Sequence, residues 1–325
     1  MIKYLLGIDI GGTKCAVILG ESDESGRIQI IGKSSFPTET AKGFDFTINT
    51  IFAAADELLM QSAVSPSDLS AIGISCGGPL DSTKGIIMSP PNLPGWDNIL
   101  IVKLFENKYA VRTALQNDAN ACALAEWKYG AGIGYENMVF LTFGTGMGSG
   151  LILNGRLYAG TNDMAGEVGH IRLERTGPVG YGKAGSFEGF CSGGGIAQLA
   201  QTAALERLQM GEKVSFCAGI ELLPQITAKS VAEAAFAGDT LAIEIYRTCG
   251  SYLGNALALL IDILNPELIV LGSIYGRAQS LIEPYMRQVI QRECVSHSYK
   301  VCQIVPAGLG EQIGDYAALS VASYS

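Results

Sequence analysis

Paired cysteine motifs, basic clusters and long apolar runs are all missing from this chain, and each absence excludes a class of protein. None of its eight cysteines forms a Cys-x-x-Cys pair, and several lie inside apolar runs, so we expect buried thiols of a reducing compartment and no disulfide framework. The formal net charge is −9 and no basic stripe is visible, which argues against a nucleic-acid partner. A nucleotide held through Mg²⁺ and backbone amides remains compatible with an acidic chain.

Membrane-spanning and secretory segments are not expected either. The longest apolar stretch, from Ala256 to Leu264, is too short to span a bilayer and contains Asp262. The first residues lead directly into a strand and a glycine turn, unlike a signal peptide. We therefore expect a cytoplasmic protein without a membrane partner. With 325 residues and 48% hydrophobic residues, the chain can build two ordinary domains.

Two similar loops, about 130 residues apart, are the most informative feature that is present. Each consists of an apolar strand, a turn rich in glycine and hydroxyl groups, and a second strand, over residues 5–20 and 140–155. Glycines at such turns leave backbone N–H groups bare, and with the Thr13 and Thr145 hydroxyls these form concavities suited to phosphate oxygens. The pair predicts a nucleotide cleft between duplicated domains.

Strands and helices alternate in both halves of the sequence, which predicts an α/β protein. The first domain is predicted over residues 1–116, with a C-terminal helix of about 311–325 packing back on it, and the second over 117–310. Glycine-dense residues 155–195 are expected to lack regular elements. Strands are predicted over 3–10, 14–20, 27–35, 69–75, 112–116, 138–157 (with a turn), 268–271 and 300–305, and helices over 44–62, 120–129, 195–209, 228–237, 239–264, 278–292 and from Asp315 onward.

Three short motif matches occur in unsuitable settings. Residues 177–183 fit a P-loop pattern, but Ala184 replaces the required hydroxyl residue and no strand precedes it. Gly180, Gly182 and Gly185 fit a dinucleotide-binding pattern in the same segment. Residues 73–77 resemble a nucleophile elbow, but the only histidine late in the chain is His297, so a tight turn after the strand is the better interpretation.

Asp118 is the strongest candidate for chemistry. It lies where an apolar strand stops and a helix begins, so it could act as an N-cap, but strand ends facing a cleft are also where α/β proteins place ligands. Glu167, His170 and Glu188 crowd the glycine-rich segment and could bind several hydroxyls of a sugar. A lone histidine is more often structural than catalytic, which leaves both interpretations of His170 open.

Taken in order, these motifs resemble the ROK family (repressor, open reading frame, kinase), whose sugar kinases have a two-domain actin-like, ribonuclease H-like ATPase fold with a cleft between the domains. The resemblance covers nearly the whole chain and rests on five motifs. They are Asp9-Ile10-Gly11-Gly12-Thr13-Lys14, Asn117-Asp118, Gly144-Thr145-Gly146-Met147-Gly148, Gly166-Glu167-Val168-Gly169-His170, and Asn265-Pro266-Glu267 leading to Leu271-Gly272.

The resemblance implies ATP-dependent phosphorylation of a hexose at its 6-hydroxyl. By that resemblance Asp118 is the general base, and Asp9 lies near Mg²⁺. The sugar would be held by Gly78, Asn117, Asp118, Glu167, His170 and Glu188. The phosphates of ATP would be cradled by Gly11, Gly12, Thr13, Lys14, Gly144, Thr145 and Gly146, with Gly272 beside the adenosine.

One departure from the family pattern concerns metal. Many members carry a zinc loop with three cysteines after the histidine, and alignment on Glu188 places Val179, Tyr181 and Ser186 at those positions. These side chains cannot replace three thiolates in a tetrahedral zinc site. We therefore predict no structural zinc, with His170 oriented by hydrogen bonds or packing.

The sequence does not identify the hexose. Glucose is the first substrate expected, and N-acetylmannosamine, N-acetylglucosamine, fructose, allose and β-glucosides are alternatives that similar proteins accept. Another class remains open, namely a sugar-sensing transcriptional regulator, although a strand already begins at Lys3 and no DNA-binding head is expected. A catalytically silent sugar sensor is a further alternative. The apolar helices 239–264 and 278–292 predict a homodimer.

Overall fold

The computed structural model describes residues 3–324, which form two compact units. The first unit contains residues 3–136, 150–165 and 308–324, and the second contains 137–149 and 166–307. The sequence-based division begins the second domain at residue 117, whereas the contacts assign the helix that starts there to the first unit. No helix within residues 3–324 is long and apolar enough to cross a membrane.

A five-stranded mixed sheet, in the order β3-β2-β1-β4-β7, organises the first unit. Its strands are β1 (Lys3–Ile10), β2 (Lys14–Ser22), β3 (Ile28–Pro37), β4 (Leu69–Cys76) and β7 (Thr113–Asn117). Strands β3, β2 and β1 pair antiparallel, whereas β1, β4 and β7 run parallel. Leu6 and Ile8 of β1 enter one hydrophobic core, and Leu5 enters another. Because both faces are covered, β1, β2 and β4 are buried and apolar along most of their length, whereas β3 at the edge of the sheet is largely exposed.

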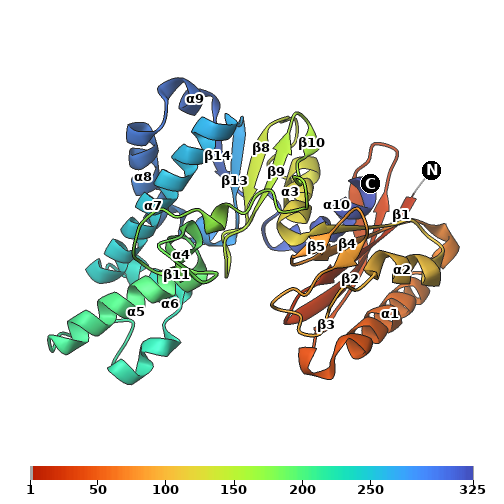
Figure 1. Ribbon diagram of the computed structural model, residues 1–325, viewed down its shortest axis with the longest axis horizontal. Coiled ribbons are helices and arrows are strands. Elements are labelled where there is room, and N and C mark those ends of the chain that lie inside the picture. The colour runs from red at the N-terminus through yellow and green to blue at the C-terminus, as the bar shows by residue number, and fades with distance from the viewer. Residues whose placement is uncertain (1–2, 325) are drawn as a thin grey trace. The chain divides into compact units, whose positions relative to one another are not determined.

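Helices cover the two faces of this sheet. Helix α1 (Phe44–Gln61) and helix α2 (Ile101–Tyr109) contribute Ile51 and Phe105 to the first core, whereas α10 (Ile313–Tyr324) contributes Ala318 to the second. Figure 1 shows α10, in blue, among the red and orange strands of the first unit. A Cβ at Gly73 of β4 would lie 2.2 Å from the carbonyl oxygen of Ala318, so helix and strand approach with backbone against backbone.

The rest of the first unit consists of short elements around one more helix. These are the hairpin β5 (Leu80–Asp81) and β6 (Ile86–Ile87), helix α3 (Asp118–Tyr129), the antiparallel pair β9 (Ser149–Leu153) and β10 (Arg156–Leu157), and single turns η1 (Thr40–Lys42), η2 (Pro66–Asp68) and η5 (Gly310–Gln312). Glu126 of α3 is fully buried and accepts N–H bonds from Ala131, Gly308 and Leu309 at 2.8, 3.0 and 2.9 Å. This carboxylate fixes the chain where it returns to the first unit at residue 308.

Three parallel strands, β8 (Met138–Leu141), β13 (Leu268–Leu271) and β14 (Gln303–Pro306), pair side by side in the second unit. Gly250 and Gly254 of α7 let α8 approach closely, because a Cβ there would lie 2.7 and 2.6 Å from carbonyl oxygens of α8. The other elements are η3 (Val168–His170), β11 (Val179–Gly180), β12 (Lys183–Ala184), α4 (Phe187–Phe190), α5 (Gly193–Gln209), η4 (Ile220–Gln225), α6 (Ala228–Phe236), α7 (Thr240–Leu264), α8 (Ser273–Glu293) and α9 (Ser296–Val301).

The predicted α/β class is confirmed, and most predicted elements occur within a few residues of their expected bounds. Helix α2 was not predicted, and α8 begins at Ser273 rather than at 278. The strand predicted over 300–305 is wrong at its start, because Lys300 and Val301 are helical and β14 begins only at Gln303, opposite Leu268 of β13. A strand needs a partner to accept its backbone hydrogen bonds, and β13 offers none earlier.

The cysteines are all free thiols, and all eight lie within the described residues. Six are buried, and Cys122 and Cys294 are half-buried. Burial raises the pKa of the Cys76 thiol well above its ordinary value, so this thiol stays protonated at neutral pH. The cysteines therefore behave as small apolar core residues, as the sequence suggested.

The contact between Gly73 and α10 predicts a large loss of stability in Gly73→Ala. The added methyl group would overlap backbone atoms of Ala318 and Ala322, so the free energy of unfolding should fall by about 2–3 kcal/mol or more. Gly276→Ala is the matched control, because its Cβ would meet nothing closer than 3.9 Å and the residue is helical. Chemical denaturation measures both variants, and equal stabilities would contradict the predicted overlap.

Candidate active site

The carboxyl ends of three parallel strands define one edge of the sheet in the first unit. Strands β1, β4 and β7 end at Ile10, Cys76 and Asn117, which lie opposite one another along the sheet. The residues that follow, including Gly11 and Asp118, therefore leave the sheet at the same edge. In open α/β sheets ligands bind beyond the carboxyl ends of the strands, so this edge is a candidate site.

The turn after β1 is held in one shape. Gly11 donates its N–H to the carbonyl oxygen of Lys14 at 3.1 Å, and the Thr38 hydroxyl donates to the carbonyl oxygen of Gly11 at 2.5 Å. A Cβ on Gly12 would lie 2.5 Å from the carbonyl oxygen of Asn92, so the neighbouring segment leaves room only for glycine. The turn is therefore tight and rigid, as a preformed binding loop requires.

The same turn presents donors to solvent. Within residues 3–324, the N–H groups of Gly12 and Thr13 have no acceptor, and the side chains of Thr13 and Lys14 are exposed. Backbone N–H groups together with a hydroxyl and an ammonium group are suited to bind phosphate oxygens. The predicted phosphate loop therefore has the donors that such a loop needs.

Asn117, and not Asp118, is the N-cap of α3. The Asn117 side chain accepts the N–H of Ala119 at 2.9 Å with the extended backbone of a cap residue, and α3 begins at Asp118. Asp118 Oδ1 also accepts from Ala119, at 2.8 Å, and the side chain is exposed to solvent. The interpretation of Asp118 as the N-cap of this helix is therefore wrong, because Asn117 supplies the cap. The carboxylate of Asp118 remains available to a ligand.

Carboxylates crowd this edge of the sheet. The pKa of Asp9 is raised to about 6. Burial is the largest cause, and the negative charges of Asp118 and Asp315 add to it. The pKa of Asp118 is also raised, mainly by desolvation, because many protein atoms surround the carboxyl group. Part of the side chain nevertheless remains in contact with solvent. Lys33 is bound to Asp315 at 2.5 Å and offsets part of this negative charge. Such a site favours a proton or a cation.

In the second unit, the loop at Gly144–Gly146 packs on the start of α5. Gly144 donates to the carbonyl oxygen of Gly146 at 3.0 Å, and Gly193 at the first position of α5 donates to the carbonyl oxygen of Gly144 at 2.8 Å. Gly272 lies beside the same loop, since a Cβ there would be 2.2 Å from the carbonyl oxygen of Thr142. Thus Gly272 and the 144–146 loop, predicted to serve one nucleotide, are neighbours.

Glu188 joins this loop to the segment that contains Glu167 and His170. Its Oε2 accepts the N–H of Met147 at 3.0 Å, and its Cβ would lie 3.4 Å from a Cβ on Gly169. The side chains of Glu167 and His170 are exposed and Glu188 is half-buried. The three predicted sugar ligands of the second unit therefore belong to one local cluster, which also touches the predicted phosphate loop.

The residues at the zinc-loop positions form a β-hairpin. Val179 lies in β11, and Tyr181 forms the turn to β12 with Gly182, both at positive φ (44° and 74°). Gln198 of α5 accepts the N–H of Val179 and donates to its carbonyl oxygen, both at 2.9 Å, and the Ser186 hydroxyl caps α4. Within residues 3–324, no group of three or more histidine, cysteine or acidic side chains could hold a metal ion.

The weaker motif matches have ordinary structural explanations. The P-loop and dinucleotide-binding patterns fall in the β11–β12 hairpin, which lacks the required order of strand, loop and helix. Ser75 of the elbow pattern is only 2% exposed inside β4, and β5 rather than a helix follows. A nucleophile must be exposed after a sharp strand-to-helix turn, so the elbow pattern is excluded as well, and none of the three patterns defines a site.

Sequence reasoning missed two features of the site. Asn92 contacts the Gly12 turn, and its side-chain amide lies 3.5 Å from a Cβ position on Gly77. In the second unit, a cavity of about 420 Å³ lies between α6, α7 and the start of α8, just after Gly272. Its lining includes Phe236, Tyr246 and Ile274. The i, i+4, i+8 spacing of 228, 232 and 236 on α6 was the signal that could have indicated this face.

The whole chain is similar to sugar kinases of known sequence and structure. A glucokinase of Halalkalibacterium halodurans is 33% identical over 287 residues, covering 87% of this chain and 84% of the relative. The crystal structure of a ROK hexokinase from Thermus thermophilus has a TM-score of 0.78 at 28% identity, covering 98% of this chain and 97% of that one. A ROK family glucokinase from Streptomyces griseus, solved in complex with glucose and AMPPNP, has a TM-score of 0.76 at 26% identity over the full length of both chains.

The fold is therefore that of the actin-like ATPases, to which these kinase structures belong. Within that class the assignment can be narrower, because the family model described as "ROK family" matches residues 5–323. This chain belongs to the ROK family.

The hairpin predicts that purified protein contains far less than one zinc per chain. Val179, Tyr181 and Ser186 supply no thiolate, and a chelator should leave the melting temperature unchanged because hydrogen bonds to Gln198 hold the hairpin. Elemental analysis by mass spectrometry, with a zinc-binding protein as the positive control, measures the content. One zinc per chain would show that the alignment of this loop is wrong.

Proposed function

We propose that this chain is an ATP-dependent hexose kinase that phosphorylates glucose at its 6-hydroxyl group. The observation that carries the proposal is the position of Asp118, a carboxylate of raised pKa that leaves the sheet at the same edge as the Gly11–Lys14 turn. The glucokinase relative, at 33% identity over most of both chains, supports the same reaction and substrate.

Asp118 acts as the general base in this proposal. Its carboxylate accepts the proton of the 6-hydroxyl while the sugar oxygen forms a bond to the γ-phosphorus of ATP. The bond from that phosphorus to the bridging oxygen breaks, and ADP leaves with those electrons. Phosphoryl transfer asks the protein for positioning, charge neutralisation and a base, and this site offers each.

Sugar and nucleotide are held by groups that the sequence singled out. The sugar hydroxyls are bound by Gly78, Asn117, Glu167, His170 and Glu188. The phosphates are bound by the turns at 11–14 and 144–146. Adenine occupies the cavity of about 420 Å³ beside the start of α8, where Phe236 and Ile274 provide apolar surface for the base.

One carboxylate of the first unit, Asp9, could hold Mg²⁺ together with the phosphates of ATP. Asp9 is half-buried, and its pKa is raised partly by two neighbouring acidic residues, a surplus of negative charge that a divalent cation would neutralise. When bound with ATP, Mg²⁺ would neutralise charge on the phosphate oxygens. Asp9 would hold it, directly or through water, close to the Gly11–Lys14 turn.

We also propose a cytoplasmic homodimer. Leu259 and Ile263 of α7 and Val295 before α9 are exposed apolar side chains, with exposed fractions of 43%, 73% and 57%. An interface between two copies would remove these side chains from water. The free thiols are compatible with a reducing compartment.

Replacing Asp118 with asparagine should reduce glucose-dependent ADP release by a factor of about 10² or more, because an amide cannot accept the proton. Glucose affinity, measured by calorimetry, should remain nearly unchanged. A coupled assay over a panel of hexoses measures turnover and selects the substrate. Asp45→Asn, in the first turn of α1, is the matched control and should leave kcat unchanged. Full turnover in the Asp118 variant would remove it from the mechanism.

The raised pKa values predict an acidic limit of activity near pH 6. Asp9 and Asp118 are both proposed to act in ionised form. Activity is therefore present above their pKa values and is lost as the pH falls through them. The pKa of Asp9 is about 6, and kcat/KM for glucose should fall about tenfold or more per pH unit below that value. Because Mg²⁺ and protons compete for Asp9, higher Mg²⁺ should shift the limit to lower pH. A profile that is flat down to pH 4.5 would contradict these roles.

A further inference from the structure

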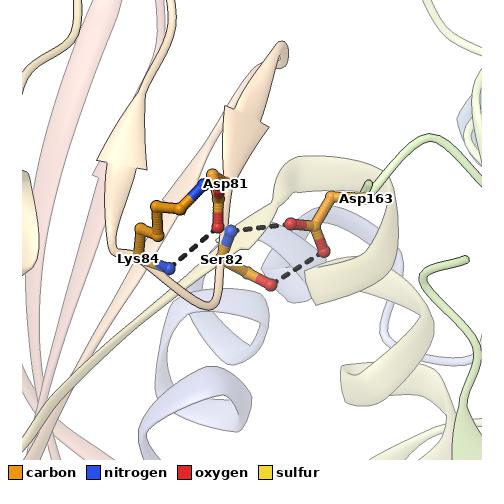
Figure 2. A network of polar contacts seen from close by, with 4 residues as sticks. All are labelled: Asp81, Ser82, Lys84 and Asp163. Atoms are coloured by element: carbon orange, nitrogen blue, oxygen red, sulfur yellow. Dashed lines mark hydrogen bonds and ion pairs between the residues drawn. The ribbon is translucent and has the colours of Figure 1, made fainter. Parts of the chain in front are cut away.

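Ser82 and Asp163 form a two-point contact that none of the preceding functional assignments uses. Asp163 Oδ2 accepts the backbone N–H of Ser82 at 2.7 Å, and Oδ1 accepts its hydroxyl, also at 2.7 Å (Figure 2). Both donors belong to one residue, so the carboxylate fixes the position and the orientation of Ser82 together. Both residues are half-buried, which limits competition from water.

The local backbone structure of both residues favours this contact. Ser82 lies in the turn of the β5–β6 hairpin, which Lys84 closes separately by donating its N–H and its Nζ to Asp81, each at 2.8 Å. Asp163 has φ of 60°, a left-handed conformation that aspartate and asparagine tolerate better than most residues. The ends of its loop are tied by Ala165, which donates to the carbonyl oxygen of Ala159 at 3.0 Å.

The place of the contact along the chain gives it a function. Ser82 lies four positions after Gly78, and Asp163 lies four positions before Glu167. Gly78 and Glu167 are both proposed sugar ligands, so each partner is connected to one of them by a short stretch of backbone. A Cβ on Gly78 would lie 3.3 Å from the amide nitrogen of Asn117, which places this turn beside a third proposed ligand.

We propose that Asp163 and Ser82 are a positioning pair for the hexose, which holds the backbone segment leading to Gly78 beside Asn117 in a sugar-binding arrangement within the first unit. The inference rests on the proposed function. Neither residue needs to touch the sugar, because a small displacement of a ligand group reduces affinity without removing any group. The pair acts on the hexose and not on ATP, since within residues 3–324 no hydrogen bond joins Ser82 or Asp163 to the Gly11–Lys14 turn or to the 144–146 loop.

The test compares variants that remove or keep the contact. Asp163→Gly removes the carboxylate and tolerates the positive φ, so its KM for glucose should rise about tenfold, with kcat and the KM for ATP changed less than twofold. Asp163→Asn keeps one acceptor oxygen and should recover most of the affinity. Ser82→Ala, which keeps the backbone donor, should raise KM about threefold, and should add nothing in the Asp163→Gly background.

Lys84→Ala is the matched control, because it removes the other contact of the same turn and leaves Ser82 and Asp163 in place (Figure 2). It should leave the KM for glucose unchanged. The melting temperature of each variant, and calorimetric binding of glucose without ATP, separate lost affinity from lost folding. If wild-type protein phosphorylates glucose and Asp163→Gly has the same KM, the positioning pair is wrong. If the wild type neither binds nor phosphorylates any hexose, the proposed function fails and the pair fails with it.

Discussion

The backbone ladder between β1, β4 and β7 determines where the candidate catalytic groups of the first unit lie. Asp118 and the turn at Gly11 share one edge of the sheet only because Ile10, Cys76 and Asn117 lie in one row of that ladder. A register shift of one residue would turn every side chain of a strand to the opposite face. The precision with which the site residues are placed therefore equals that of the strand register. That precision depends in turn on α10, which packs directly on the backbone of Gly73. One support of this edge is thus a helix from near the C-terminus, and the contact contains no functional group.

The same edge carries an electrostatic cost. A raised carboxylate pKa means that the folded state binds a proton more tightly than the unfolded state, so the ionised side chain destabilises the protein at neutral pH. For Asp9, whose pKa rises from 3.8 to about 6, this cost is on the order of 3 kcal/mol at neutral pH, and it is lost as the pH falls from the folded-state pKa to below the unfolded-state pKa. Glu126 shows the opposite solution, since three backbone N–H groups compensate its buried carboxylate. The contrast indicates that Glu126 serves the fold, whereas the charge at Asp9, which Lys14 and Lys33 compensate only in part, is available to a ligand.

The parts of the structure that depend on local patterns could be predicted, and those that depend on distant contacts could not. The apolar runs that become β1, β4 and β13 predict buried strands. The glycine turns after β1 and β8 identify the two predicted phosphate loops, at residues 11–14 and 144–146. Sequence alone could not show that Asn117 takes the cap position, because both it and Asp118 are good cap residues. The contact between Ser82 and Asp163 was beyond prediction for a different reason. It joins residues 81 positions apart, and neither belongs to a motif.

The hairpin at residues 179–184 lies where the family resemblance implies a zinc loop, and its own contacts hold it. Gln198 satisfies both backbone groups of Val179, and positive φ at Tyr181 and Gly182 closes the turn. The hairpin also supports His170. Lys183 donates to its carbonyl oxygen at 2.7 Å, and the ring of Tyr181 packs edge-on at 6.3 Å. These bonds are exposed, and exposed hydrogen bonds are weaker restraints than zinc–thiolate bonds. The position of His170 therefore depends on an exposed hydrogen bond and one ring contact, which restrain it less than metal coordination would.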